Sequence, residues 1–194
     1  RPGGELGNYI QVAKIGQLFM VLPGLFAAVI FPLSAAGGPS ALARQLPLMG
    51  RLISFVYLPA LLFLAFTGYY LFPFLYGPDF TGMYIPFLLL IPGIWSLSLH
   101  ALLTAYFAGQ NKVKVNLRGS LTALLVILLS DLILIPALGA SGAAIGSSLG
   151  YFAYAAVVFS RFQQEEHISF RSFLFIRAGD LKLIKHECSR FFRK

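Results

Sequence analysis

Polar side chains inside long apolar stretches are the residues that could do chemistry in this chain. Lys14 lies in an apolar stretch over residues 10–34, and Gln11 and Gln17 lie one turn before and after it. Residues three apart share a face of a helix, so these side chains form a polar stripe. The stripe could line a water-filled cavity in which the lysine attracts an anionic phosphate. Alternatively, Lys14 extends its ammonium group into nearby lipid headgroups.

His100 is a second candidate, in an apolar stretch over residues 83–108. Ser96 and Thr104 lie four residues before and after it, on the same helix face. Because histidine titrates near neutral pH, this face could line a proton or substrate path. The alternative is a structural hydrogen bond to a neighbouring membrane helix.

Asp131 is the one carboxylate within an apolar stretch, over residues 115–136. A lone carboxylate is costly in lipid, so it is a functional candidate by default. Paired, it would bind a coupling cation or a basic side chain of another helix. The alternative is a hydrogen bond between helices at the outer end of the span.

No pattern of a catalytic or metal site appears in the sequence. It has no nucleophile motif, no glycine-rich phosphate loop and no Cys/His cluster with metal-ligand spacing. The single cysteine, Cys188, excludes an internal disulfide. We therefore predict neither an enzyme nor a bound cofactor or metal.

Composition indicates a membrane protein. The chain is 58% hydrophobic and 11% charged, with a mean hydropathy of +0.78, whereas soluble domains carry about 25% charged residues. The net charge of +8 resides mostly in short connections and the C-terminal tail, where membrane proteins keep lysine and arginine. This distribution argues against nucleic acid as a partner.

Five apolar segments approach or exceed the roughly 20 residues that cross a bilayer. We predict an all-α, polytopic membrane bundle with spans at residues 10–34, 46–76, 83–108, 115–136 and 141–162. Pro23, Pro59 and Pro92 fall inside spans and tend to kink them. Interrupted helices fit a transporter, although proline is common in membrane helices generally.

Charge in the connections predicts the orientation. Basic connections, with Arg44 and with Lys112, alternate with connections that lack lysine and arginine. The positive-inside rule then makes the C-terminus cytoplasmic and the other end of the bundle external. Arg51 is expected at the membrane interface. An odd number of spans suggests that an N-terminal portion precedes this chain.

The predicted domains are a transmembrane bundle over residues 1–162 and a basic tail over 163–194. In the tail, apolar residues recur at helical spacing among lysines and arginines, at Leu181, Ile184, Cys188 and Phe191. This pattern predicts an interfacial amphipathic helix on an anionic inner leaflet. The alternative is a solvated end that only fixes the topology.

The last two spans are expected to form a tightly packed hairpin with its turn at residues 136–141. Gly142, Gly146 and Gly150 fall four apart and so share one helix face. Small residues let membrane helices approach closely, which is a main source of packing energy in lipid.

Several motifs, in order, resemble polysaccharide flippases of the multidrug/oligosaccharidyl-lipid/polysaccharide exporter superfamily. The hairpin resembles their "L-I-P-x-x-G-x-x-G-A-A" pattern, and residues 6–13 resemble a "G-x-Y-x-x-A" helix start. Three further stretches are similar to an inner helix end, an outer loop and an inner loop of the family: Phe31-Pro-Leu-Ser34, Phe74-Leu-Tyr-Gly-Pro-Asp-Phe80 and Ala105-Tyr-Phe-Ala-Gly-Gln-Asn-Lys112. The family often has Asn where Asp131 stands, which puts a shared coupling site in doubt.

The resemblance implies the second bundle of a two-bundle transporter in the bacterial inner membrane. Its substrate would be an isoprenoid-pyrophosphate-linked oligosaccharide, and its partners membrane lipid and the missing N-terminal bundle. Lys14 would be a cavity cation near the pyrophosphate. Two alternatives remain, namely a multidrug or lipid-precursor exporter of the same superfamily and a membrane enzyme that modifies glycans.

Overall fold

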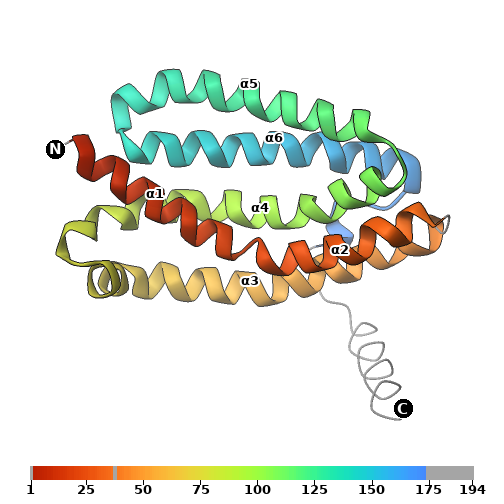
Figure 1. The fold of residues 1–194 in the computed structure, drawn as a ribbon, viewed down its shortest axis with the longest axis horizontal. Coiled ribbons are helices and arrows are strands. Elements are labelled where there is room, and N and C mark those ends of the chain that lie inside the picture. The colour runs from red at the N-terminus through yellow and green to blue at the C-terminus, as the bar shows by residue number, and fades with distance from the viewer. Residues whose placement is uncertain (1, 37–38, 174–194) are drawn as a thin grey trace, which may run out of the picture.

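The computed structural model describes residues 2–36 and 39–173, and every regular element within those ranges is a helix (Figure 1). Four helices are long and apolar enough to cross a membrane, and there are five such spans if the bent pair α1 and α2 counts as one. This confirms the predicted all-α polytopic bundle. The elements are α1 (Pro2–Leu18), α2 (Val21–Ala35), α3 (Pro39–Tyr76), η1 (Pro78–Met83), α4 (Tyr84–Gly109), α5 (Val113–Leu138), α6 (Ala140–Glu166) and η2 (Phe170–Phe173).

The first span is broken between α1 and α2, which meet at 44°. Pro23 has no N–H to donate to the carbonyl of Phe19, four residues earlier, so the helix is interrupted there. The hydroxyl of Tyr57 on α3 donates a hydrogen bond to that carbonyl. By contrast, Pro59 and Pro92 lie inside the continuous helices α3 and α4. The break therefore combines a missing donor with a replacement donor from a neighbouring helix.

Helix α4 forms the centre of the bundle. It contacts α1, α2, α3, α5 and α6, and it contributes more buried residues than any other helix in the described part of the chain. Glycines allow the closest approaches. A Cβ on Gly93 would lie 2.8 Å from the Cα of Ser148 on α6, and one on Gly109 would lie 2.4 Å from the carbonyl oxygen of Phe31 on α2. The interior is thus packed backbone to backbone at these points.

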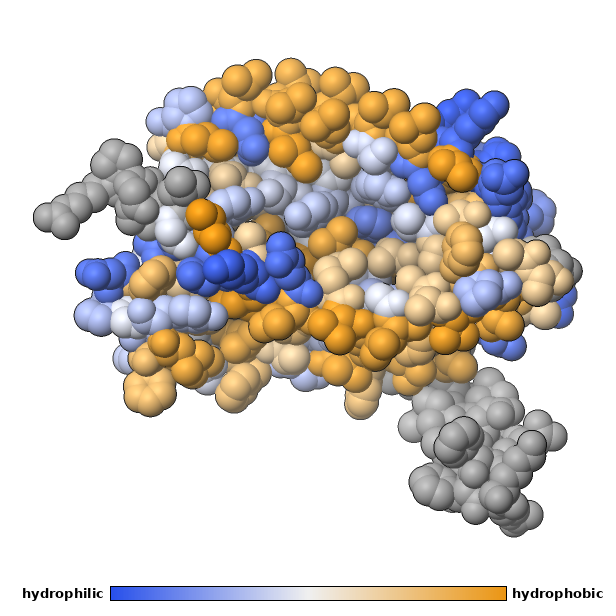
Figure 2. All heavy atoms as spheres, viewed as in Figure 1, coloured by the Kyte–Doolittle hydropathy of each residue, from blue (hydrophilic) through white to orange (hydrophobic). Residues whose placement is uncertain are grey.

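The outer surface of the bundle is apolar. On α3, Phe66 is 81% exposed and Phe74 is 84% exposed, and on α5 Leu132 is 74% exposed. Figure 2 shows α5 as an apolar edge of the molecule. Such large exposed hydrophobic side chains suit a lipid environment and would be a liability in water.

Helices α5 and α6 form the predicted hairpin, but its turn is shorter than expected. Helix α5 continues through Pro136 to Leu138, and α6 begins at Ala140, so Gly139 alone joins them. Its backbone angles, φ 56° and ψ −130°, are accessible to glycine and strained for other residues. A single residue therefore reverses the chain, where we predicted a turn over 136–141.

The connections alternate between two ends of the bundle (Figure 1). The η1 end holds Asp79 and the turn at Gly139. The opposite end, here called the basic end, holds Arg44, Lys112, Lys114, Arg118 and Arg161. Helix α6 runs to Glu166, four residues beyond residue 162, where we expected the bundle to end. The predicted amphipathic helix with Leu181, Ile184, Cys188 and Phe191 lies outside the described residues.

Candidate functional site

The stripe predicted around Lys14 lies on the side of α1 that the bundle leaves open. Val12 and Ile15 are buried against the core, whereas Lys14 and Gln17 are exposed and Gln11 is partly buried. Figure 2 shows a hydrophilic patch over α1 beside apolar surface. Within residues 2–36 and 39–173, these three side chains make no hydrogen bond or ion pair. Their donors are therefore available to a ligand or a further protein surface.

A polar contact joins α1 to α6 next to this stripe. The hydroxyls of Tyr9 and Ser147 are 2.8 Å apart. Tyr151 and Tyr154 follow Ser147 at spacings of four and three, so the three share a face of α6 and are partly buried. Tyr154, the last of the three, stacks on His100 of α4.

His100 is buried in the contact between α4 and α6. Its Nδ1 lies 3.0 Å from the carbonyl oxygen of Ser96, and its ring stacks on Tyr154 with centroids 4.5 Å apart and planes at 16°. The Ser96 hydroxyl donates to the carbonyl of Tyr151 at 3.3 Å, and the Thr104 hydroxyl donates to the carbonyl of His100 at 3.0 Å. This polar face of α4 thus holds two helices together, and no hydrogen bond within the described ranges joins His100 to Lys14.

Asp131 lies in the contact between α5 and α6. Its Oδ1 is buried with no hydrogen-bond partner among the described residues, and a Cβ added to Gly146 would lie 2.1 Å from it. In the same part of the chain, no group of three or more His, Cys, Asp or Glu residues could hold a metal ion. The structure therefore places the carboxylate against a glycine, outside any described cluster of metal ligands.

Gly142 and Gly150 complete this contact. A Cβ on Gly142 would lie 2.3 Å from the carbonyl oxygen of Leu134, and one on Gly150 would lie 2.3 Å from Cγ1 of Ile127. All three glycines of the predicted stripe therefore face α5. Their role is positional, since they set how closely the two helices approach.

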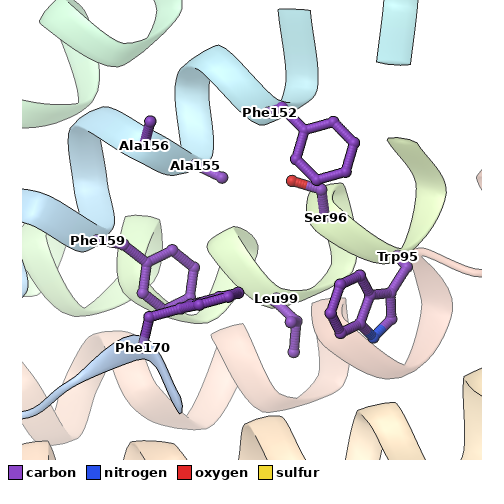
Figure 3. Close-up of a pocket in the computed structure, with 8 residues that line it drawn as sticks. All are labelled: Trp95, Ser96, Leu99, Phe152, Ala155, Ala156, Phe159 and Phe170. Atoms are coloured by element: carbon purple, nitrogen blue, oxygen red, sulfur yellow. The ribbon is translucent and has the colours of Figure 1, made fainter. Parts of the chain in front are cut away.

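The pocket in Figure 3 is apolar and lies between α4, α6 and η2. Trp95, Phe152, Phe159 and Phe170 point into it, and the one polar side chain in its lining is Ser96, whose hydroxyl is already bonded to α6. It can accept an apolar group but offers no charge for a phosphate. The open stripe on α1 remains the better candidate for an anionic ligand.

Sequence reasoning missed the network at the basic end. Lys112 Nζ lies 2.6 Å from Glu165 and Arg161 Nε lies 2.8 Å from the same carboxylate, while the Tyr106 hydroxyl donates to Glu166 at 2.6 Å. The sequence did contain an indication of this network. Glu165 and Glu166 lie at the C-terminus of α6, where the helix dipole disfavours negative charge. They require cationic or hydrogen-bonding partners.

Arg51 is more buried than its expected place at the membrane interface suggested. It is only 7% exposed among the described helices, and its depth in a membrane stays a prediction. A buried guanidinium is rare unless it is paired or hydrogen-bonded. The apolar residues around it in the sequence gave no indication of that burial.

The fold and its apolar outer surface define a multi-pass α-helical membrane protein. No protein-family model, curated protein or solved structure matches this chain. The resemblance to polysaccharide flippases therefore rests on the residue patterns alone.

Proposed function

We propose that this chain is one bundle of a flippase that moves isoprenoid-pyrophosphate-linked oligosaccharides across the bacterial inner membrane. The observation that carries the proposal is the stripe of Gln11, Lys14 and Gln17 on the open side of α1, whose donors have no partner among the described residues. An ammonium group within a span is costly without an anionic partner. A pyrophosphate would supply that partner, and the glutamine amides would donate to its remaining oxygens.

The bent first span supports the same proposal. Transporter sites are commonly built from discontinuous helices near the bilayer midplane. The break between α1 and α2 lies directly after Gln17, between Leu18 and Val21. A second bundle facing this side would convert the open stripe into a closed chamber. Rocking of the two bundles would then expose the chamber to each side of the membrane in turn, while the isoprenoid tail stays in the bilayer.

The first experiment asks whether the stripe is exposed to water in the membrane. In the transporter with both bundles, carrying Cys188→Ser, Lys14→Cys and Gln17→Cys should react with a water-soluble thiol reagent. Phe66→Cys, at an exposed apolar position of α3, should stay unreactive because lipid covers it. Unreactive cysteines at both positions of the stripe would contradict an aqueous chamber.

The second experiment tests the substrate. An isoprenoid pyrophosphate should bind the chain in nanodiscs, and Lys14→Gln should weaken binding about tenfold, the loss expected for a charge-assisted hydrogen bond. Lys14→Arg should retain most of the affinity, and Arg44→Gln is the control for net charge. Equal losses in Lys14→Gln and Arg44→Gln, or transport of cationic drugs by the complete transporter, would overturn the substrate assignment.

A further inference from the structure

The structure contains a second cationic feature, separate from the stripe on α1. A cleft of about 190 Å³ opens between α5 and α6 at the basic end, lined by Arg118, Arg161, Ser160, Gln164, Val115 and Val157. Two guanidinium groups from neighbouring helices therefore border one small cleft. Figure 2 shows hydrophilic side chains gathered at this end, next to the apolar surface of α5.

Both arginines retain donors for a ligand. Arg161 uses Nε to reach Glu165 at 2.8 Å, and no bond of its terminal amino groups is found among residues 2–36 and 39–173. Arg118 is exposed, and in the same ranges it makes no side-chain hydrogen bond or ion pair. Lys112 shares the carboxylate of Glu165, so that single negative charge is divided between two cations. The walls of the cleft keep a net positive charge.

The position of the cleft along α5 and α6 suits a lipid headgroup. Arg118 lies five residues after the first residue of α5, and Arg161 lies five residues before the last residue of α6. At 1.5 Å per residue, both are about 7–8 Å from the helix ends. Basic pockets between membrane helices at the positively charged side are typical sites for anionic lipid headgroups.

An apolar track continues from Arg118 along the outside of α5. Residues at spacings of three, seven, eleven and fourteen from Arg118 share its helix face. All four are exposed leucines, at 51%, 61%, 62% and 74%, namely Leu121, Leu125, Leu129 and Leu132. A cationic cleft above a leucine track is complementary to a molecule with an anionic head and a long apolar tail.

We propose that this cleft binds the phosphodiester headgroup of an anionic membrane phospholipid, with an acyl chain along the leucine track of α5. The guanidinium groups pair with the phosphate oxygens, and the Gln164 amide supplies a further donor. The leucine track distinguishes such a lipid from a free phosphate ion, which has nothing to place there. The inference depends on insertion of α5 and α6 in a membrane and is independent of the transported substrate.

Lipid binding to the whole chain, purified in a neutral detergent, provides the test. Phosphatidylglycerol is titrated and the bound lipid is counted by native mass spectrometry, with phosphatidylcholine and inorganic phosphate as comparison ligands. Phosphatidylglycerol should bind at least tenfold more tightly than phosphatidylcholine, and millimolar inorganic phosphate should not displace it. Equal binding of the two lipids, or displacement by inorganic phosphate, would overturn the proposal.

Matched variants separate the cleft from general surface charge. Arg118→Gln should weaken phosphatidylglycerol binding about fivefold, which corresponds to about 1 kcal/mol for one basic residue. Arg44→Gln and Arg171→Gln, which remove the same charge outside the cleft, should change binding less than twofold. Ser160→Glu places a carboxylate in the cleft, leaves both arginines in place, and should abolish the preference for the anionic lipid. Equal losses in the control variants, or an unchanged preference in Ser160→Glu, would contradict a specific site.

Discussion

Replacing Gly142 with alanine is the sharpest test of the packing between α5 and α6. A Cβ at this position would lie 2.3 Å from the carbonyl oxygen of Leu134, 2.5 Å from its carbonyl carbon and 2.8 Å from the nitrogen of Ile135. Carbon atoms pack favourably at about 3.5–4.0 Å, so the two backbones must separate by roughly 1 Å. No side chain can rotate to relieve the contact, because all three neighbours are backbone atoms.

The expected cost follows from that geometry. Overpacking typically destabilises a protein by about 1–3 kcal/mol, and we expect about 2 kcal/mol for Gly142→Ala because a whole helix must move. Gly150→Ala should cost less, about 1 kcal/mol, since its nearest neighbour is the Ile127 side chain, which can change rotamer. Gly24→Ala is the matched control. A Cβ there meets no heavy atom within 4 Å, so alanine should be neutral or stabilise α2 by about 0.5–1 kcal/mol.

Unfolding by sodium dodecyl sulfate in mixed micelles, followed by far-ultraviolet circular dichroism, measures these differences. The predicted order of stability is Gly24→Ala at or above wild type, then Gly150→Ala, then Gly142→Ala. If Gly142→Ala is as stable as Gly24→Ala, the helices do not approach as closely as described, and the hairpin argument is wrong.

Three further substitutions test other contacts. Tyr57→Phe removes the donor to the Phe19 carbonyl at the break and should cost about 1 kcal/mol in the same assay, whereas Tyr70→Phe, at an exposed position of α3, should cost nothing measurable. Glu165→Gln removes both ion pairs of Glu165 and should lower the melting temperature at low salt. The difference from wild type should shrink at 1 M salt, where the Debye length is about 3 Å. A difference in melting temperature that is independent of salt would contradict an ionic origin. His100→Phe should keep the stack on Tyr154 and should weaken isoprenoid-pyrophosphate binding less than Lys14→Gln does. The reverse order in a binding titration would indicate that His100 binds the substrate.

The sequence was sufficient for the helical segments because membrane burial leaves a strong and simple pattern. The five apolar stretches correspond to the four long apolar helices and the bent pair of α1 and α2. The four-residue glycine spacing identified the face of α6 that meets α5. The single-residue turn was not predictable from Pro136, because proline suggested an earlier helix end. In the structure, α5 continues to Leu138 before Gly139 reverses the chain.

Contacts between residues far apart in the chain could not be predicted from the sequence. The polar pattern around His100 indicated a special face of α4, but not that Tyr154 would stack on it from α6. Pro23 predicted a kink, but not that Tyr57 of another helix would donate a hydrogen bond to the Phe19 carbonyl at the break. Nothing in the spacing of Arg118 and Arg161 placed them beside one cleft. Contacts of this kind depend on how different helices pack against each other. The periodicity of residues within one helix does not predict them.

The predicted orientation depends on connections that alternate between the two faces of the membrane. The outer side of the η1 end and the cytoplasmic side of the basic end both follow from this alternation. Single cysteines in a Cys188→Ser background, at Asp79 near the η1 end and at Lys112 at the basic end, can be labelled with a membrane-impermeant thiol reagent in intact cells and in inverted vesicles. We predict that Asp79→Cys is labelled from the outside alone and Lys112→Cys from the cytoplasmic side alone. Labelling of both cysteines from the same side would contradict the five-span arrangement and the functions proposed from it.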